Sequence, residues 1–287
     1  MRDLNYGLKR LVRTTKEGSY ATQGARHDIL QQAANTLHEL GYRKLRPQSL
    51  KPKHVEALVT HWQTQKLSPG TIKNRLSHLR WWAGVIGKPA IIARSNDHYH
   101  IERRVYVTGE NKAREIDAQK LAKVTDEFTR LALQLQQAFG LRREEAIKFS
   151  PLYADRGDKL VLKGSWTKGG KSREIPVRDD AQRQLLDDVR RVVGRGALIP
   201  CNKNYVQQLR TYERNTVKAG LDKNHGLRHA YAQRRYEEIT GWTCPAVGGP
   251  DRKTLTPAQR EQDRNARETV SGELGHARQS IVAVYLG

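Results

Sequence analysis

Apolar residues recur at helical spacing through the first hundred residues, and short segments with Gly or Pro separate the runs. The clearest run starts at Ser68, which is a good N-cap, and Pro69 suits the first helical position. Its 3.6-residue period then lasts until Gly87. This pattern predicts a helical unit, with helices that include residues 29–40, 55–62 and 69–86.

The pattern changes in the following stretch, residues 88–111, which lacks helical period and contains Pro89 and several β-branched residues. We interpret it as a linker that contains a short strand. Beyond it, Asp117 is suited to cap one helix that continues to Phe139 and stops at Gly140. The Pro- and Gly-rich segment 243–257 predicts a long loop, closed by a helix start at Thr256-Pro257. Other helices are predicted at 185–193, 205–219 and from 225 onward.

A small antiparallel sheet is predicted between these helices. Leu160 to Leu162 have the character of a strand, and the alternating segments 165–167 and 173–177 flank Lys168-Gly169-Gly170-Lys171. Gly-Gly favours a tight hairpin turn, because both residues can take positive φ. The second half of the chain is therefore expected to be a larger mixed unit.

Composition narrows the function. The 287 residues include 52 Lys and Arg against 30 Asp and Glu, which leaves a formal charge of +22. So large an excess favours an anionic partner, and nucleic acid is the first candidate. No apolar run approaches a membrane span, and the N-terminus lacks the apolar core of a signal peptide, so a cytoplasmic, nucleoid-associated protein is expected. Cys201 and Cys244 are expected to be inert thiols, because two cysteines alone cannot make a zinc knuckle.

Polar residues gather on one face of the helix predicted over 69–86. They are hydrogen-bond donors that could meet DNA phosphates. The alternative is an ordinary solvated basic face. The residues are Lys73, Asn74, Arg75, His78 and Arg80.

The most informative short segment runs from Asn224 to His229. If Asn224 caps a helix, His225 and Arg228 lie on one face of its first turn. An anion there would meet an imidazole, a guanidinium and the positive end of the helix dipole. The alternative is a pair of solvated polar residues.

Two other segments carry weaker signals. Arg142 follows Gly140, and Glu145 stands three residues later, where it could fix the arginine or form an ordinary surface ion pair. Lys168 and Lys171 flank the predicted hairpin tip, where lysines are usually solvated.

Near the end of the chain, Leu274-Gly275-His276 is followed nine residues later by Tyr285. In one straight helix these residues would lie on opposite faces, roughly 13 Å apart along the axis. A shared site therefore needs a break between Ala277 and Val284, or delivery of the tyrosine in trans. His276 is expected at a helix start. The sequence has only two residues after Tyr285, so we expect the tail to be mobile without DNA and Tyr285 to lie outside hydrogen-bond reach of Arg228. The alternative is that Tyr285 is a core or interface tyrosine that only anchors the tail.

These motifs, in this order, resemble those of the tyrosine recombinases, the phage-type integrases. Gly140-Leu141-Arg142 with Glu145 resembles the first arginine box, and Lys168-Gly169-Gly170-Lys171 with Arg173 resembles the β-hairpin lysine motif. The segment 225–230 is similar to the second box, and His276 with Tyr285 has the family's spacing. The resemblance is strong over 140–285, whereas the N-terminal unit resembles the core-binding domain in pattern alone. The segment between Arg228 and His276 is longer than in compact members.

The resemblance implies a catalytic set of Arg142, Lys168, His225, Arg228, His276 and Tyr285. Tyr285 would attack the phosphodiester and form a covalent phosphotyrosine, while the arginines neutralise the phosphate. His225 would accept the tyrosine proton, Lys168 would protonate the leaving 5′-oxygen and His276 would donate a hydrogen bond to the phosphate. Glu145 is read as the residue that orients Arg142. No metal or cofactor is required.

The fold class implied is mainly α with a small antiparallel sheet, as a two-domain DNA clamp. Residues 1–105 are expected to form a helical core-binding domain and residues 112–287 the catalytic domain. The expected function is site-specific recombination that integrates or excises a mobile element. The expected partners are double-stranded DNA, further copies of the chain in a tetramer on paired sites, and accessory DNA-bending proteins.

Two alternatives remain open. A type IB topoisomerase shares much of this chemistry but reseals the same strand. A DNA-binding protein without catalysis could act as an architectural or regulatory factor, although the complete set of six residues argues against it.

Overall fold

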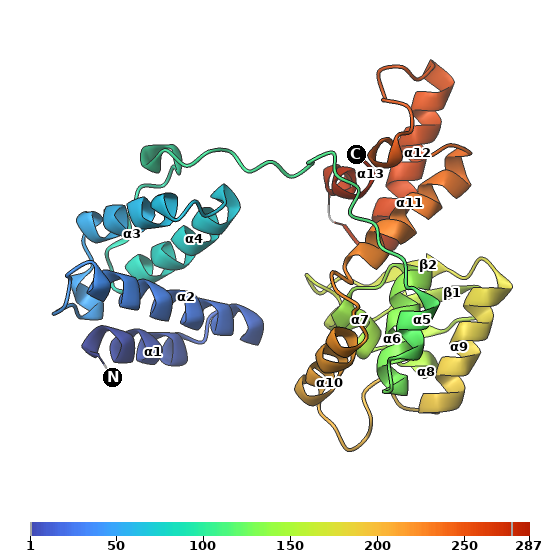
Figure 1. The fold of residues 1–287 in the computed structure, drawn as a ribbon, viewed down its shortest axis with the longest axis horizontal. Helices are drawn as coiled ribbons and strands as arrows, with labels where there is room; N and C mark the ends of the chain where they lie inside the picture. The colour runs from blue at the N-terminus through green and yellow to red at the C-terminus, as the bar shows by residue number, and fades with distance from the viewer. Residues whose placement is uncertain (1, 277) are drawn as a thin grey trace. The chain divides into compact units, whose positions relative to one another are not determined.

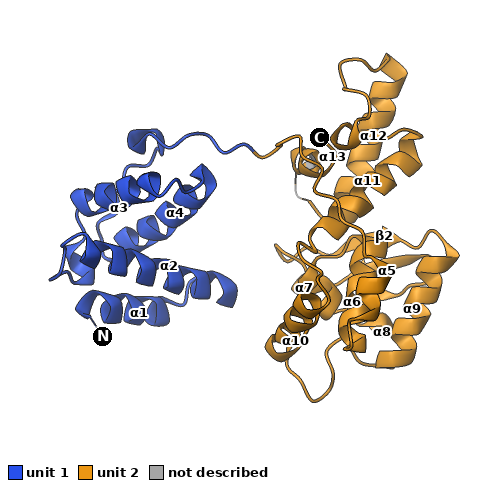
Figure 2. Cartoon of the chain, viewed as in Figure 1, with its two compact units in different colours: residues 1–105 blue, residues 106–287 orange. Residues whose placement is uncertain are grey.

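The computed structural model describes residues 2–276 and 278–287. The chain divides into two compact units, Met1–Val105 and Tyr106–Gly287 (Figure 2). Residues 106–111, assigned to the linker from the sequence, group with the second unit. Within the described residues, no helix combines the length and apolar character of a membrane span.

The first unit is a bundle of four α-helices with short 3₁₀ turns (Figure 1). The cap at Ser68 is confirmed, since its side chain accepts a hydrogen bond from the Thr71 N–H. The strand expected in the linker is wrong, because that stretch contains 3₁₀ turns, the first of which starts at Pro89, a residue that has no N–H to donate to a ladder. The elements are α1 (Asp3–Thr15), α2 (Tyr20–Glu39), η1 (Pro47–Ser49), α3 (Pro52–Thr64), α4 (Pro69–Val85), η2 (Pro89–Ile91) and η3 (Asp97–Tyr99).

The core of this unit is built from the apolar stripes that the sequence shows. Leu37, Leu58 and Leu79 are completely buried, one from each of α2, α3 and α4. Trp82 is buried beside them, and its indole N–H donates to the Pro47 carbonyl at 3.0 Å. A buried Trp needs such a partner for its polar edge, so this bond joins η1 to the bundle.

The second unit surrounds helix α6, which packs against α7, α9, α10 and α11 (Figure 1). The prediction of a mainly helical fold with a small antiparallel sheet is confirmed. The elements are α5 (Ala118–Ala122), α6 (Glu127–Phe139), α7 (Arg143–Ile147), α8 (Pro151–Ala154), β1 (Lys159–Leu162), η4 (Gly164–Trp166), β2 (Arg173–Pro176), α9 (Asp180–Val193), α10 (Tyr205–Lys218), α11 (Gly226–Thr240), η5 (Pro245–Val247), α12 (Pro257–Leu274), η6 (Gln279–Val282) and α13 (Ala283–Leu286).

The single helix expected from Asp117 to Phe139 is wrong, because the chain breaks between α5 and α6. Asp117 caps α5 as expected, but Asp126 starts a new helix by accepting the Thr129 N–H at 2.8 Å. Asp126 also accepts the Gln208 amide of α10 at 2.9 Å. A tertiary contact therefore fixes the break, and the helical period alone could not reveal it.

The hairpin also differs from its prediction. β1 pairs with β2, so that Leu160 faces Ile175, and residues 164–166 form a 3₁₀ turn instead of a strand. Trp166 turns toward Tyr153, and the two ring centroids are 5.4 Å apart. The hairpin connection is consequently the long segment 163–172. Gly169 and Gly170 do take positive φ, 91° and 72°, as the Gly-Gly pair predicted.

We predict unequal stability losses from removing the two caps. Asp126→Ala should lower the free energy of unfolding of the second unit by about 1–2 kcal/mol, since it leaves the first turn of α6 and the Gln208 amide without their acceptor. Asp117→Ala is the matched control and should cost less, because α5 is short and exposed. Urea unfolding followed by circular dichroism would measure both; an equal effect would contradict the tertiary role of Asp126.

Candidate active site

Helix α11 positions two of the predicted residues. His225, not Asn224, occupies its N-cap position, and its side chain makes no capping bond. The expected Asn224 cap is therefore wrong. The chain approaches α11 through a tight turn in which the Gly226 N–H donates to the Lys223 carbonyl at 2.7 Å. The Asn224 amide faces back to the Leu221 carbonyl.

The Arg228 guanidinium is the centre of the site, and only 1% of the residue is exposed. Its Nη1 donates to the Gly140 carbonyl at 2.6 Å and its Nη2 donates to the Leu274 carbonyl. Its Nε donates to the Tyr285 hydroxyl at 3.4 Å, and Nη2 lies 3.4 Å from His276 Nε2. Arg228 thus joins the ends of α6 and α12 to the tyrosine. Burial lowers the pKa of Arg228 to about 10, so it remains charged at neutral pH.

Tyr285 lies among imidazoles and is 6% exposed. Its ring stacks on His276 with centroids 5.2 Å apart and packs on His229 at 4.4 Å. Its hydroxyl lies 3.5 Å from His225 Nε2. The expectation that Tyr285 lies outside hydrogen-bond reach of Arg228 is therefore wrong.

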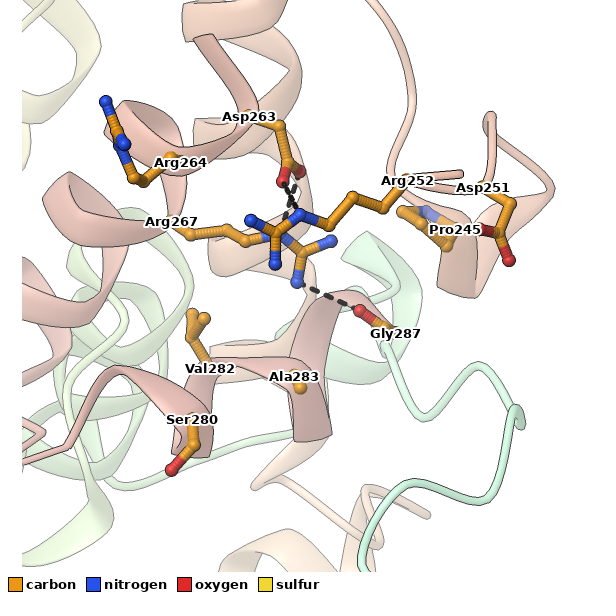
Figure 3. Close-up of a pocket in the computed structure, with 10 residues that line it drawn as sticks. All are labelled: Pro245, Asp251, Arg252, Asp263, Arg264, Arg267, Ser280, Val282, Ala283 and Gly287. Atoms are coloured by element: carbon orange, nitrogen blue, oxygen red, sulfur yellow. Dashed lines mark hydrogen bonds and ion pairs between the residues drawn. The ribbon is translucent and has the colours of Figure 1, made fainter. Parts of the chain in front are cut away.

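The tail reaches the site because the chain turns after α12. Gly275 ends that helix with φ 66°, and η6 and α13 lead back, so the predicted break between His276 and Tyr285 is confirmed. His276 follows a helix end, not a helix start as expected. Two side chains donate to backbone carbonyls at this end of the chain. Gln233 donates to the Tyr285 carbonyl at 3.1 Å, and Arg267 donates to the Gly287 carbonyl at 2.9 Å (Figure 3).

The arginines and burial around the tyrosine keep the histidines neutral. Burial, followed by the charge of Arg228, lowers the pKa of His276 to about 3. Burial and His225 lower the pKa of His229 to about 4. Burial also lowers the pKa of His225, and the charges of Arg228 and Arg142 lower it further. A neutral His225 can accept a proton at pH 7.

The tautomer of His276 follows from its neighbour. Because Arg228 can only donate, His276 Nε2 must accept, which leaves the proton on Nδ1. Among the residues that the structure describes, this buried Nδ1 has no hydrogen-bond partner. The site therefore contains a buried donor next to the tyrosine.

A second charged cluster lies next to the site and consists of Glu145, Arg142 and Arg173. Glu145 is completely buried and accepts the Arg142 N–H and the Arg142 guanidinium, each at 2.7 Å. It also receives a bidentate pair of bonds from Arg173 at 2.8 and 2.7 Å. Despite burial, the hydrogen bonds and charge of Arg173, followed by Arg142, hold the pKa of Glu145 at about 2. The geometry thus supports the prediction that Glu145 orients Arg142.

Sequence reasoning missed the importance of Arg173, which it treated only as part of the hairpin motif. The signal was present, because Arg173 and Ile175 lie on the same buried face of β2. The Arg173 Nε also donates to the Glu273 carbonyl at 2.8 Å. Arg173 therefore connects β2 to both α7 and α12.

Lys168 is not brought together with the other predicted residues. It lies exposed in the segment that connects the two strands. It forms no hydrogen bond or ion pair with any residue in 2–276 or 278–287. Its role stays a prediction.

The basic face predicted on α4 is wrong in part. His78 is buried, and burial followed by Arg26 lowers its pKa. Arg80 donates to the Ala93 carbonyl at 2.9 Å, so it anchors the following segment. Arg75 lies over the Trp62 ring. Contacts within the first unit thus engage three side chains of the predicted face, those of Arg75, His78 and Arg80. Lys73 and Asn74 keep accessible surface.

Comparison with known structures defines the fold first. The chain aligns over 99% of its length with a lambda integrase dimer bound to a COC′ core site, at TM-score 0.62, 15% identity and 95% coverage of that chain. It aligns over 98% with a lambda integrase tetramer bound to a Holliday junction, at TM-score 0.60, 14% identity and 76% coverage. The XerH site-specific recombinase bound to difH gives TM-score 0.56, 16% identity, and coverage of 99% of this chain and 81% of that one. The fold is that of two-domain tyrosine recombinases.

The family follows from the sequence. The family model described as "Phage integrase, N-terminal" matches residues 1–91, and the one described as "Integrase" matches residues 106–234. The chain belongs to the phage integrase family of tyrosine recombinases. Among curated protein sequences there is no match.

We predict that Glu145→Gln destabilises the second unit by about 3–5 kcal/mol, since it leaves the buried Arg173 guanidinium without its counter-charge. The matched control is Glu144→Gln, on the same helix but exposed and paired with Lys148, which should cost less than about 1 kcal/mol. Denaturant unfolding measures both.

The same carboxylate has a pH signature. The pKa of the Glu145 carboxyl is lower in the folded state than in the unfolded state. Its contribution to the free energy of unfolding is therefore fully present above the usual pKa of 4.5 and is lost as the pH falls toward about 2. The stability difference between the wild type and Glu145→Gln should therefore shrink over that window. A constant difference would contradict this assignment.

Proposed function

We propose that this protein is a site-specific DNA recombinase that cleaves and rejoins strands through a 3′-phosphotyrosine at Tyr285, and that it integrates or excises a mobile element. The observation that supports this most is the convergence of three groups. The Tyr285 hydroxyl lies 3.4 Å from Arg228 and 3.5 Å from His225, which precede it by 57 and 60 residues in the sequence.

The arginines would stabilise the phosphate. Negative charge on the non-bridging oxygens grows during transfer, and a charged guanidinium offers planar donors for it. Arg142 is suited to this task because Glu145 fixes its side chain while 22% of that side chain remains exposed. The Arg228 Nε donates to the Tyr285 hydroxyl. When DNA enters, a phosphate oxygen would replace this hydroxyl as the acceptor of the Nε–H. The Nδ1–H of His276, which has no hydrogen-bond partner among the described residues, would donate to the phosphate.

The proton path would run from the tyrosine to His225. As the phenolic oxygen bonds to phosphorus, its proton passes to His225 Nε2, and the bond from phosphorus to the 5′-oxygen breaks. Lys168 would protonate that leaving oxygen. Since Lys168 lies on the exposed connection between β1 and β2, this step requires the connection to close over the DNA. No metal or other cofactor enters the scheme.

The partners proposed are double-stranded DNA and further copies of this chain. One similar structure is a lambda integrase tetramer on a Holliday junction, and another is XerH on its difH substrate. We extend this to a tetramer on paired sites, with residues 1–105 as the core-binding domain, residues 112–287 as the catalytic domain, and accessory DNA-bending proteins. The formal charge of +22 is consistent with a large contact to phosphates.

We predict that Tyr285→Phe binds duplex DNA normally and forms no covalent adduct, because only the phenolic oxygen is lost while the stacked ring remains. Trapping on a nicked suicide substrate measures this directly. A protein–DNA adduct with the wild type excludes a DNA-binding protein without catalysis, and strand exchange between two DNAs separates a recombinase from a topoisomerase. An adduct with the Phe variant would place the nucleophile elsewhere.

Mixing Tyr285→Phe with Arg228→Ala tests how the tyrosine is delivered. Because the structure places Tyr285 beside Arg228 of its own chain, the mixture should stay inactive despite proper assembly on DNA, which would support delivery in cis. Restored cleavage would show delivery in trans.

We also predict a steep salt dependence for binding to non-cognate duplex. If 6–10 phosphates are neutralised, affinity should fall by roughly 10³–10⁵ between 50 and 200 mM salt. Fluorescence anisotropy would measure it, and an affinity that hardly changes across this range would argue against phosphate-driven binding.

A further inference from the structure

One side chain links the tyrosine to the segment that enters the second unit. Gln233, on α11, is 9% exposed. Its amide nitrogen donates to the Tyr285 carbonyl at 3.1 Å and to Asn111 Oδ1 at 3.0 Å. Asn111 belongs to the segment that follows the first unit. The amide of Gln233 therefore connects residues that lie far apart in the sequence.

Backbone groups fix the direction of both amides. The Tyr285 carbonyl can only accept, so the nitrogen of Gln233 must face it. Asn111 Oδ1 accepts the Ala113 N–H at 3.0 Å, and a backbone N–H can only donate, so this oxygen must face it. The remaining N–H of Gln233 then meets the same oxygen. The two side chains form a relay in which Gln233 donates to both ends, to Asn111 of the entering segment and to the tyrosine carbonyl.

The entering segment is itself attached to α11. The Arg114 N–H donates to the Gly226 carbonyl at 3.0 Å. The two backbones approach so closely that a Cβ on Gly226 would lie 2.7 Å from the Lys112 carbonyl oxygen. Further along, Arg234 pairs with Glu115 at 2.6 Å. Residues 111–115 thus run along the helix that carries His225 and Arg228.

The relay has a clear task at α13. This helix has a single turn, so its last carbonyls find no partners within it. Tyr285 supplies one of these carbonyls. Since α13 is far too short to be stable alone, contacts outside the helix decide where it lies: the burial of Tyr285 and Leu286 in the core, and outside donors to its carbonyls.

We propose that Gln233 is a positioning residue that places the Tyr285 hydroxyl for attack, and that Asn111 makes this placement depend on the segment joining the two units. The proposal rests on the proposed function. It implies that a change in this segment, when the first unit engages DNA, reaches the nucleophile through two hydrogen bonds.

The first test is Gln233→Leu, which keeps the size of the side chain but removes the donor. Adduct formation in a single turnover should slow by roughly 10–100-fold, because a misplacement of about 1 Å costs about that much. Duplex affinity should stay as in the wild type. The matched control is Gln262→Leu on α12, an amide that also donates to two oxygens, the backbone carbonyls of Ile239 and Thr240, but away from the tyrosine. It should cleave at the wild-type rate, and an equal loss in both variants would overturn the proposal.

Asn111 offers a conservative rescue. Asn111→Ala removes the acceptor for Gln233 and should slow adduct formation by several-fold. Asn111→Asp keeps an oxygen for both the Ala113 and Gln233 donors and should restore most of the rate. A purely structural role for this exposed residue predicts that both variants behave alike, which would remove Asn111 from the relay.

Amide hydrogen exchange separates this proposal from the proposed function. In the full chain without DNA, Gln233→Leu should increase exchange over residues 283–287, whereas Gln262→Leu should not. If the wild type forms no adduct but this exchange difference is found, the recombinase assignment fails and the positioning of α13 stands. If Gln233→Leu changes neither exchange nor adduct formation, the positioning role is overturned; if it changes exchange alone, placement for attack is overturned.

Discussion

The second unit depends on a buried positive charge. Arg228 is removed from water, and a charge in that position is stable only when its donors are satisfied. The carbonyls that satisfy it, of Gly140 and Leu274, lie at the ends of α6 and α12, where helices leave carbonyls without partners. One guanidinium therefore donates hydrogen bonds to the carbonyls at two helix ends. The same contacts place it where the Tyr285 hydroxyl can reach it.

The surrounding charges follow from this arrangement. Arg142 and Arg173 share one buried carboxylate, Glu145, and so the cluster retains excess positive charge. Burial, followed by the positive charge of neighbouring residues, lowers the pKa of the imidazoles at positions 225, 229 and 276 and favours their neutral form. A site with charged arginines and neutral histidines can attract an anion and still accept a proton. Those are the two capacities that phosphoryl transfer to a tyrosine requires.

The tail shows how a weak element acquires a definite position. Helix α13 has one turn, and it lies where side chains of α11 and α12 reach its carbonyls. Figure 3 shows Arg267 between Asp263 and Gly287, so that a buried carboxylate orients the guanidinium that holds the last residue. The tail also packs into the apolar core, since Val282, Tyr285 and Leu286 are buried there. Polar contacts and apolar packing together therefore hold the tyrosine in the site.

The sequence by itself determined the helical stripes, the caps at Ser68, Asp117 and Thr256, and the positive φ of the Gly-Gly pair, because these depend on residues close together in the chain. It also indicated the candidate residues of the site, through motifs in a fixed order. Helical geometry predicted the bend before Tyr285 on the condition that His276 and Tyr285 share a site within one chain, and delivery of the tyrosine in trans was the alternative.

Only the tertiary structure decided which polar residues are buried and what they contact. The break before Asp126 depends on α10, the burial of His78 depends on the packing of the first unit, and the docking of Tyr285 depends on Arg228 and Gln233. The sequence shows Arg173 only as part of the hairpin motif, and the structure shows that β2 turns it toward Glu145. The physical reason is the same in each case. A local pattern specifies the face of a helix or strand, but the partner that satisfies a buried charge or carbonyl comes from a distant part of the chain.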